Sequence, residues 1–193
     1  MAEHAELPDA VAEAAGRPVN EVLTLRAAHG GQMRRLEIWL SLAIIVLDQV
    51  TKAIVRATVP LHSSVTVIPG FMDVTHVRNT GAAFGFLNGA DFPFKTAVIA
   101  VMATAALGAI GWYAAHLARH QLVARTSLAL VIGGAAGNLL DRFVTGSVVD
   151  FVDVYWRTHH FWAFNVADSA ITVGVAVMIL DMLGAEGHVS EAA

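Results

Sequence analysis

The segment from Thr96 to Ala118 contains no Lys, Arg, Asp or Glu, although charged residues lie directly before and after it. As an α-helix it would be about 34 Å long at roughly 1.5 Å per residue, enough to cross the apolar part of a bilayer. The sequence therefore predicts at least one membrane-spanning helix, and a water-soluble single domain is not expected.

The composition of the whole chain agrees with a membrane protein. Apolar residues (AVILMFWYC) make up 56% of the 193 residues and charged residues 15%, whereas about one quarter of the residues in a typical soluble domain are charged. The absence of Cys excludes disulfides, thiolate zinc sites and cysteine nucleophiles. A net charge of −4 with 12 Lys and Arg offers no basic surface for nucleic acid. We therefore expect an integral membrane protein that does not bind nucleic acid.

Four membrane spans are predicted, over residues 38–59, 96–118, 122–144 and 161–183. Residues 1–35 are polar, so we expect a disordered tail with at most a short amphipathic helix and no cleavable signal peptide. Outer loops over 60–95 and 145–160 would complete a membrane domain covering 36–184, followed by a tail at 185–193. Arg residues before the first span and between the second and third favour cytoplasmic termini, although the far side carries as many basic residues.

Three of the predicted spans carry polar and charged side chains. A charge costs roughly 2.5 to 3.5 kcal/mol in the middle of an inserted helix, so such side chains are expected to face the protein interior or a wet cavity. Because consecutive spans alternate in direction, these positions fall on the same side of the membrane and predict one shared site within one leaflet. The residues are Asp48, Lys52, Asn138, Asp141, Arg142, Asn165 and Asp168.

The spacing within the spans indicates which side chains share a helix face. Asp48 and Lys52 are four residues apart, so they can neutralise each other in a low-dielectric setting. Asn138 and Arg142 repeat this spacing, and Arg142 offers five donors suited to a carboxylate or a carbonyl. For both pairs a purely structural role and a direct chemical role stay open.

Two carboxylates are candidates for the reactive groups of this site. Asp168 shares a helix face with Asn165, and Asp150 lies between apolar residues in the preceding loop. Two carboxylates in a partly desolvated pocket share a proton, and aspartic peptidases use such a pair to activate water and protonate a peptide carbonyl. Ion or proton handling is the commoner use of carboxylates in membranes, so spacing alone leaves both functions open.

Five short runs occur in order along the chain: Asp48-Gln49-Val50-Thr51-Lys52, Asn79-Thr80-Gly81-Ala82-Ala83-Phe84-Gly85, Gly137-Asn138-Leu139-Leu140-Asp141-Arg142, Val148-Val149-Asp150-Phe151 and Phe164-Asn165-Val166-Ala167-Asp168-Ser169. They resemble, in the same order, the motifs of bacterial lipoprotein signal peptidase, also called signal peptidase II. Five ordered motifs over about residues 36–184 form a specific match, whereas any one of them would be weak. The resemblance implies an intramembrane aspartic endopeptidase of the bacterial cytoplasmic membrane, without metal or organic cofactor.

The resemblance also implies a substrate and a role for each motif residue. The substrate would be a diacylglyceryl-modified prolipoprotein, cut before its modified cysteine by an enzyme that acts as a monomer in contact with membrane lipid. The catalytic pair would be Asp150 and Asp168. Residues that bind or orient the substrate would be Asn79, Gly81, Asn138, Arg142 and Asn165, and those that support the site would be Asp48, Lys52 and Asp141.

The fold expected from these observations is a membrane all-α bundle of four transmembrane helices with a small extracytoplasmic β-hairpin or sheet. Two β-prone runs over 64–68 and 71–77 flank the turn residues Pro69 and Gly70, which predicts the hairpin. The segment 145–160 is expected to form a short periplasmic lid helix anchored at the lipid interface by Trp156 and Trp162. We interpret His159 and His160 as loop residues, because adjacent histidines lack the spacing that chelates a metal.

Two other classes of function fit the buried charges. A small membrane transporter or proton-conducting protein would use the same carboxylates, although the chain shows no internal repeat of the kind transporters carry. A non-catalytic membrane adaptor would tolerate replacement of Asp150 or Asp168 by Asn. Asp153, three residues after Asp150, is a second candidate for the catalytic carboxylate, but no motif surrounds it.

Overall fold

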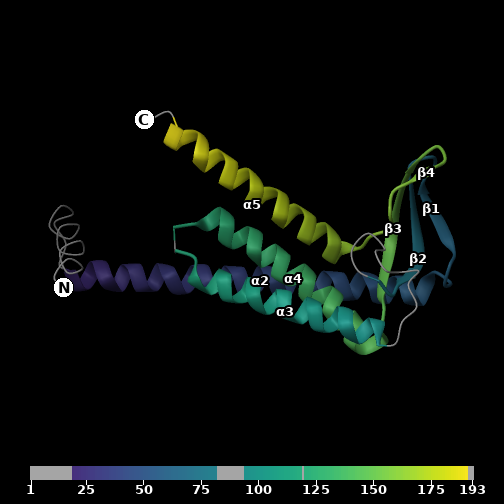
Figure 1. Ribbon diagram of the computed structural model, residues 1–193, viewed down its shortest axis with the longest axis horizontal. Coiled ribbons are helices and arrows are strands. Elements are labelled where there is room, and N and C mark those ends of the chain that lie inside the picture. Colours follow the sequence, from purple (N-terminus) through teal and green to yellow (C-terminus); the bar gives the residue numbers. More distant parts are fainter. Residues whose placement is uncertain (1–18, 82–93, 119, 191–193) are drawn as a thin grey trace. The chain divides into compact units, whose positions relative to one another are not determined.

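The apolar spans predicted from the sequence are helices in the computed structural model, which describes residues 19–81, 94–118 and 120–190 (Figure 1). The helices are α2 (Val19–Thr58), α3 (Lys95–His116), α4 (Leu122–Thr145) and α5 (Val166–Ser190). Among the described residues, four stretches are long and apolar enough to cross a membrane: Arg35–Thr58, Lys95–His116, Leu122–Thr145 and Val166–Leu183. The prediction of four apolar helices is therefore confirmed.

The chain divides into two units, residues 1–38 and 39–193. In the first unit the described backbone is helical from Val19 onward, so the disordered tail expected over 1–35 does not match the structure between residues 19 and 35. The part of that prediction covering 1–18 lies outside the described residues. In the second unit α5 continues to Ser190, beyond the predicted end of the span at 183. All side-chain contacts described below belong to the second unit.

A small antiparallel sheet contains the predicted hairpin. Its strands are β1 (Ser64–Ile68), β2 (Met72–Asn79), β3 (Val148–Trp156) and β4 (His159–His160), in that spatial order (Figure 1). In the turn between β1 and β2, Phe71 donates its backbone N–H to the carbonyl of Ile68 at 3.0 Å. Gly70 follows Pro69 there with a φ of 78°. Glycine adopts such a positive φ readily at the third residue of a β-turn. The predicted hairpin is confirmed.

The lid helix expected over 145–160 is wrong, because β3 and β4 occupy most of that segment. Four of the nine residues of β3 are valines, and β-branched side chains favour a pleated strand over a helix. The strand pairs along β2, with Asp150 opposite Val77. β2 therefore supplies backbone partners that the local sequence alone does not reveal.

The fourth span begins at Val166 rather than at the predicted residue 161. The residues before it continue the sheet, since Phe164 forms an antiparallel bridge with Val152 of β3. Asn165 is thus the last residue before the helix. The later start places Asn165 directly before α5 and Asp168 in the first turn of α5.

A small hydrophobic cluster joins the end of α2 to the sheet. Val55 and Val59 pack with Val149 and Phe151 of β3, and all four side chains are buried. Val166, at the start of α5, packs against the same cluster. Asp150 lies between two of these buried residues, so the cluster fixes its position relative to α2 and α5.

Helices α4 and α5 approach each other closely at Gly174. A Cβ atom at this position would lie 2.6 Å from the carbonyl oxygen of Ser127 and 2.8 Å from Cγ2 of Val131. A side chain therefore has no room there unless the two helices separate.

We predict that Gly174→Ala lowers the free energy of unfolding by about 1 to 3 kcal/mol, because the added methyl group overpacks the contact between α4 and α5. Gly108→Ala in α3 is the matched control, since nothing lies within 4 Å of a Cβ built there. Thermal unfolding of both purified variants in detergent tests the difference. Equal melting temperatures would contradict the packing argument.

Candidate active site

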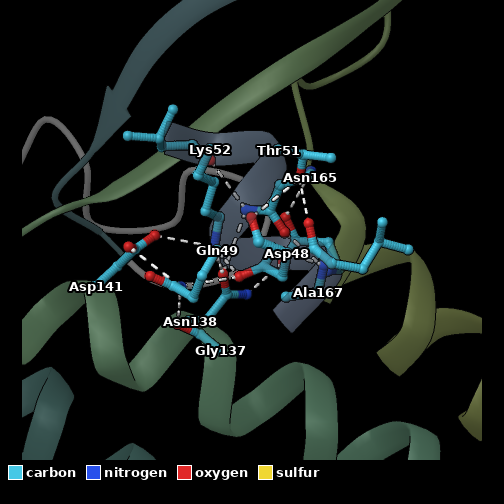
Figure 2. Close-up of polar contacts among 12 residues, drawn as sticks. Asp48, Gln49, Thr51, Lys52, Gly137, Asn138, Asp141, Asn165 and Ala167 are labelled. Atoms are coloured by element: carbon cyan, nitrogen blue, oxygen red, sulfur yellow. Dashed lines mark hydrogen bonds and ion pairs between the residues drawn. The ribbon is translucent and has the colours of Figure 1, made fainter. Parts of the chain in front are cut away.

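The four-residue spacing of Asp48 and Lys52 in α2 produces a buried ion pair. Lys52 Nζ lies 2.7 Å from Asp48 Oδ2, and both side chains are fully buried. The same Nζ lies 2.9 Å from Asp141 Oδ2 and donates to Asn138 Oδ1 at 2.9 Å (Figure 2). An ammonium group has three protons to donate. Lys52 thus makes two hydrogen bonds and a further ion pair, and its contacts with Asn138 and Asp141 connect α2 to α4.

Arg56, one helical turn beyond Lys52, balances the remaining charge. Its Nη2 donates to Asp141 Oδ1 at 2.7 Å, and its side chain is 31% exposed. Two carboxylates, Asp48 and Asp141, thus face two cations. Because an unpaired charge in a low-dielectric interior costs several kcal/mol, this balance explains how four charged side chains occupy apolar spans. Arg56 was not among the site residues predicted from the sequence, although its four-residue spacing from Lys52 places both on one helix face.

The first turn of α5 is closed by a capping box made by Asn165 and Asp168. Asn165 Oδ1 accepts the backbone N–H of Asp168 at 2.9 Å, and Asp168 Oδ2 accepts the backbone N–H of Asn165 at 3.2 Å. Asp48 Oδ1 accepts a further N–H, from Ala167, at 3.0 Å (Figure 2). The N–H groups of a first helical turn have no partners within the helix. Here Asp168 and Asp48 supply acceptors at the start of α5. These contacts hold the Asp168 carboxylate beside the charged residues of α2.

Asp150 enters the site from β3. Its Oδ1 accepts a hydrogen bond from Asn165 Nδ2 at 2.8 Å, and its Oδ2 accepts one from Asn79 Nδ2 at 3.1 Å. The side chain is buried, and this burial together with the negative charge of Asp168 raises the pKa of Asp150 to about 7. Asn165 thus links the two candidate carboxylates, because its side chain donates to Asp150 and its backbone to Asp168.

Three asparagine amides are held with their NH₂ groups directed at these carboxylates. The oxygen of Asn138 accepts from Lys52, and its Nδ2 donates to Asp168 Oδ1 at 2.8 Å. The oxygen of Asn79 accepts the backbone N–H of Gly81 at 2.9 Å, and the oxygen of Asn165 is used by the capping box. Since each oxygen already has a donor, each amide can present only its nitrogen to a carboxylate. The orientation of all three amides is therefore fixed by the surrounding contacts.

Arg142 contacts backbone carbonyls rather than the two carboxylates. Its Nη2 donates to the carbonyl of Gly81 at 2.9 Å, and its Nη1 donates to the carbonyl of Asn138 at 3.1 Å. It therefore ties the residues that follow β2 to α4. The expected direct orientation of substrate by Arg142 and Gly81 stays a prediction.

Asp153 does not share the surroundings of Asp150. Its carboxylate lies 2.9 Å from Nδ1 of His160 on β4, and it is paired in the sheet with Asp73. The odd separation along β3 directs Asp150 and Asp153 to opposite faces of the strand. Asp153 therefore contacts His160 on the sheet and lies apart from the cluster around Asp150 and Asp168.

The structure brings the predicted residues of α2, α4, α5, β3 and the end of β2 into one cluster. Gln49 also belongs to it, because its Nε2 donates to the carbonyl of Gly137 at 3.1 Å (Figure 2). The first of the five sequence motifs contains Gln49, but no role was predicted for this residue. No group of three His, Asp or Glu side chains in the described ranges could hold a metal ion. Asp150 and Asp168 share the hydrogen-bond donor Asn165, and the pKa of Asp150 is raised to about 7. Such a pair of carboxylates is suited to acid–base chemistry.

The chain is similar to known proteins over most of its length. The family described as signal peptidase (SPase) II matches residues 40–184. Lipoprotein signal peptidases of Geobacter metallireducens and Pseudomonas putida are 48% and 46% identical to the chain, covering 76% and 79% of it and 90% of each relative. A solved structure of a bacterial membrane enzyme is 34% identical with a TM-score of 0.69, covering 77% of this chain and 88% of that one.

These similarities and the four apolar helices place the chain among the membrane-embedded aspartic peptidases. Within that class it belongs to the signal peptidase II family. The family is found in the bacterial inner membrane, which agrees with the four apolar helices.

We predict that Lys52→Met lowers the free energy of unfolding by about 3 to 5 kcal/mol, because it leaves Asp48 buried without a cation. Arg56→Met is the matched control: it removes the other cation beside Asp141, but that carboxylate keeps its contact with Lys52. Denaturant unfolding in detergent, followed by helicity, should show the larger loss for Lys52→Met. Similar losses for both variants would contradict a central role for Lys52.

Proposed function

We propose that this chain removes the signal peptide from bacterial prolipoproteins by cutting before the diacylglyceryl-modified cysteine, with Asp150 and Asp168 as the catalytic residues. The observation that carries the proposal is the bridge made by Asn165, which donates to both carboxylates. Support also comes from the relatives of similar length that are named lipoprotein signal peptidases.

The chemistry follows from two carboxylates that hold one proton between them. The ionised member deprotonates a water molecule, which attacks the carbonyl carbon of the scissile peptide bond. The protonated member donates to the carbonyl oxygen as the negative charge develops there. The fixed amides of Asn79, Asn138 and Asn165 hold both carboxylates in place, so no reorganisation is needed at the moment of reaction.

The position of the site suits a substrate anchored in lipid. Asp48 lies in the last turns of α2, Arg142 near the end of α4, and Asp168 in the first turn of α5. We infer that these ends lie together near the outer leaflet, that both termini are cytoplasmic, and that the sheet is extracytoplasmic. A cysteine whose acyl chains stay in the bilayer would then present its peptide bond at the level of Asp150 and Asp168, to an enzyme that acts as a monomer.

The backbone around Gly81 is positioned to contact the substrate chain. Asn79 and Arg142 hold Gly81 from two sides, through its N–H and its carbonyl. We propose that this arrangement keeps the backbone at Gly81 aligned with the substrate chain at the scissile bond. Asn138, Arg142 and Asn165 orient the substrate and the carboxylates, while Asp48, Lys52 and Asp141 supply the rigid, charge-balanced support.

Replacing either catalytic carboxylate should abolish cleavage. We predict that Asp150→Asn and Asp168→Asn each reduce cleavage of a purified diacylglyceryl-modified prolipoprotein by at least about 10²- to 10⁴-fold, because each removes one proton-transfer group. Asp153→Asn should retain activity, since Asp153 contacts His160 rather than the site.

The three variants are compared at matched folding, judged by gel filtration and helicity in the same detergent. Retained cleavage by Asp150→Asn with loss in Asp153→Asn would move the catalytic role to Asp153. If the folded parent protein cleaves nothing, the result would contradict the proposed function and favour a role of the buried charges in transport or in holding the helices together.

The pH dependence should show an alkaline limit set by Asp150. Its pKa is raised to about 7, so the single proton of the pair is present below that pH and lost above it. We predict that kcat/KM falls as pH rises through about 7, and falls again at low pH where the second carboxylate becomes protonated. Rates measured with the parent and Asp153→Asn should give the same profile. A rate independent of pH across this range would contradict a shared-proton mechanism.

A further inference from the structure

The two catalytic carboxylates lie in different surroundings. Asp150 is 4% exposed and is the third residue of β3, where its neighbours Val149 and Phe151 are also buried. Asp168 is only partly buried and lies in the first turn of α5. Burial penalises the charged form of a carboxyl group, whereas the first turn of a helix favours a negative charge. The fold therefore treats the two members of the pair unequally.

The hydrogen bonds reinforce this inequality. Asp168 Oδ2 accepts a backbone N–H in the capping box, and its Oδ1 accepts from Asn138, whose oxygen in turn accepts from the Lys52 ammonium group. A cation thus acts on Asp168 through one amide. Asp150 accepts only from the neutral side-chain amides of Asn79 and Asn165 among its described partners. Hydrogen bonds linked to a cation or to a helix start favour the ionised form more than bonds from neutral amides do.

We propose that, before substrate binds, Asp168 is the ionised member of the pair and Asp150 the protonated member, so that Asp168 is the general base and Asp150 the general acid. This assignment rests on the proposed function for its catalytic meaning. As a statement about protonation it stands on burial, the capping box and the hydrogen bonds from Lys52 through Asn138.

The raised pKa of Asp150 agrees with the assignment, since burial and the charge of Asp168 are its two largest causes. The charged groups around the pair come from two further helices. Lys52 on α2 lowers the pKa of Asp150, but its ammonium group is directly bonded elsewhere. The ionisable groups that face the pair are Asp48 and Lys52 on α2 and Asp141 and Arg142 on α4.

The assignment fixes the route of each proton. Asp168 takes a proton from water as the water oxygen bonds to the carbonyl carbon, and Asp150 gives its proton to the carbonyl oxygen, which yields a neutral diol. The protonated Asp168 then gives its proton to the amide nitrogen, the C–N bond breaks, and Asp150 recovers a proton from a diol hydroxyl. One water is consumed, a carboxylic acid and an amine are released, and both aspartates return to their starting states.

The experiment is an NMR titration of the parent protein with carboxyl-labelled aspartate. Asp168–Ser169 is the single Asp–Ser pair in the sequence, so ¹³C-aspartate combined with ¹⁵N-serine isolates the Asp168 carboxyl signal without any substitution. ¹³C-aspartate with ¹⁵N-phenylalanine gives two signals, from Asp150–Phe151 and Asp91–Phe92. Asp150→Asn removes one of these signals. If that variant does not fold, Asp91→Asn identifies the Asp150 signal by removing the other.

At about pH 6 we expect Asp168 to show the carboxylate signal and Asp150 the carboxylic acid signal, with the Asp150 signal changing as pH rises through about 7. The reverse order would overturn the assignment. Two ionised carboxylates at pH 6, or one common midpoint for both signals, would overturn it as well. ¹³C-aspartate with ¹⁵N-valine gives two signals, from Asp73–Val74 and Asp153–Val154, and both serve as internal references outside the site.

Cleavage by the same labelled preparation is measured separately. A reversed titration order in an enzyme that cleaves prolipoprotein would overturn the assignment and leave the proposed function standing. The expected order in a folded protein that cleaves nothing would uphold the protonation states and overturn the proposed function. The two failures are therefore distinguishable.

Discussion

The carboxylate of Asp48 is the contact on which the rest of the site depends. One oxygen holds the Lys52 ammonium group at 2.7 Å, and the other accepts the backbone N–H of Ala167 at 3.0 Å. A single side chain in α2 thus sets both the cation that reaches α4 and the starting point of α5. Because Asp168 follows Ala167 directly, any displacement of Asp48 would move the helix turn that carries Asp168. The buried ion pair is therefore structural, but it also positions a carboxylate that we propose to be catalytic.

Burial makes this arrangement rigid. A buried polar group costs free energy unless it finds a hydrogen-bond partner, and the asparagine amides of the site each use both their oxygen and their nitrogen. Asn138, for example, accepts from Lys52 and donates to Asp168. Rotating this amide by half a turn would place its oxygen against a carboxylate and its NH₂ against an ammonium group. The unfavourable alternative keeps the amide in one orientation, and the same reasoning applies to Asn165 and Asn79.

The sequence predicted the parts of this structure that arise from the cost of charge in lipid. Four spans, the pairing of Asp48 with Lys52 and the convergence of three spans on one site follow from hydropathy and helical spacing. The capping box was not predicted, because the fourth span was expected to begin at residue 161, although Asn165 and Asp168 have the required three-residue spacing. The strand β3 was not predicted either, because a short valine-rich run becomes a strand only when β2, about seventy residues earlier in the chain, supplies its partner. For the same reason, the spacing of 18 residues between Asp150 and Asp168 did not predict how the two carboxylates are arranged. The difference in their surroundings depends on Asp150 lying on a strand and Asp168 on a helix.

That difference in secondary structure has a chemical consequence. A pair of carboxylates on two equivalent helix ends would feel similar dipoles and similar exposure, and one proton would be divided evenly between them. Here Asp168 lies in the first turn of a helix and accepts the backbone N–H of Asn165, whereas Asp150 comes from a sheet that packs on the end of α2 through Val55 and Val59. The helix supplies a site that favours negative charge, and the sheet supplies a buried site that disfavours it. In the proposed assignment, the start of α5 keeps Asp168 ionised and the buried strand β3 keeps Asp150 protonated at the same pH.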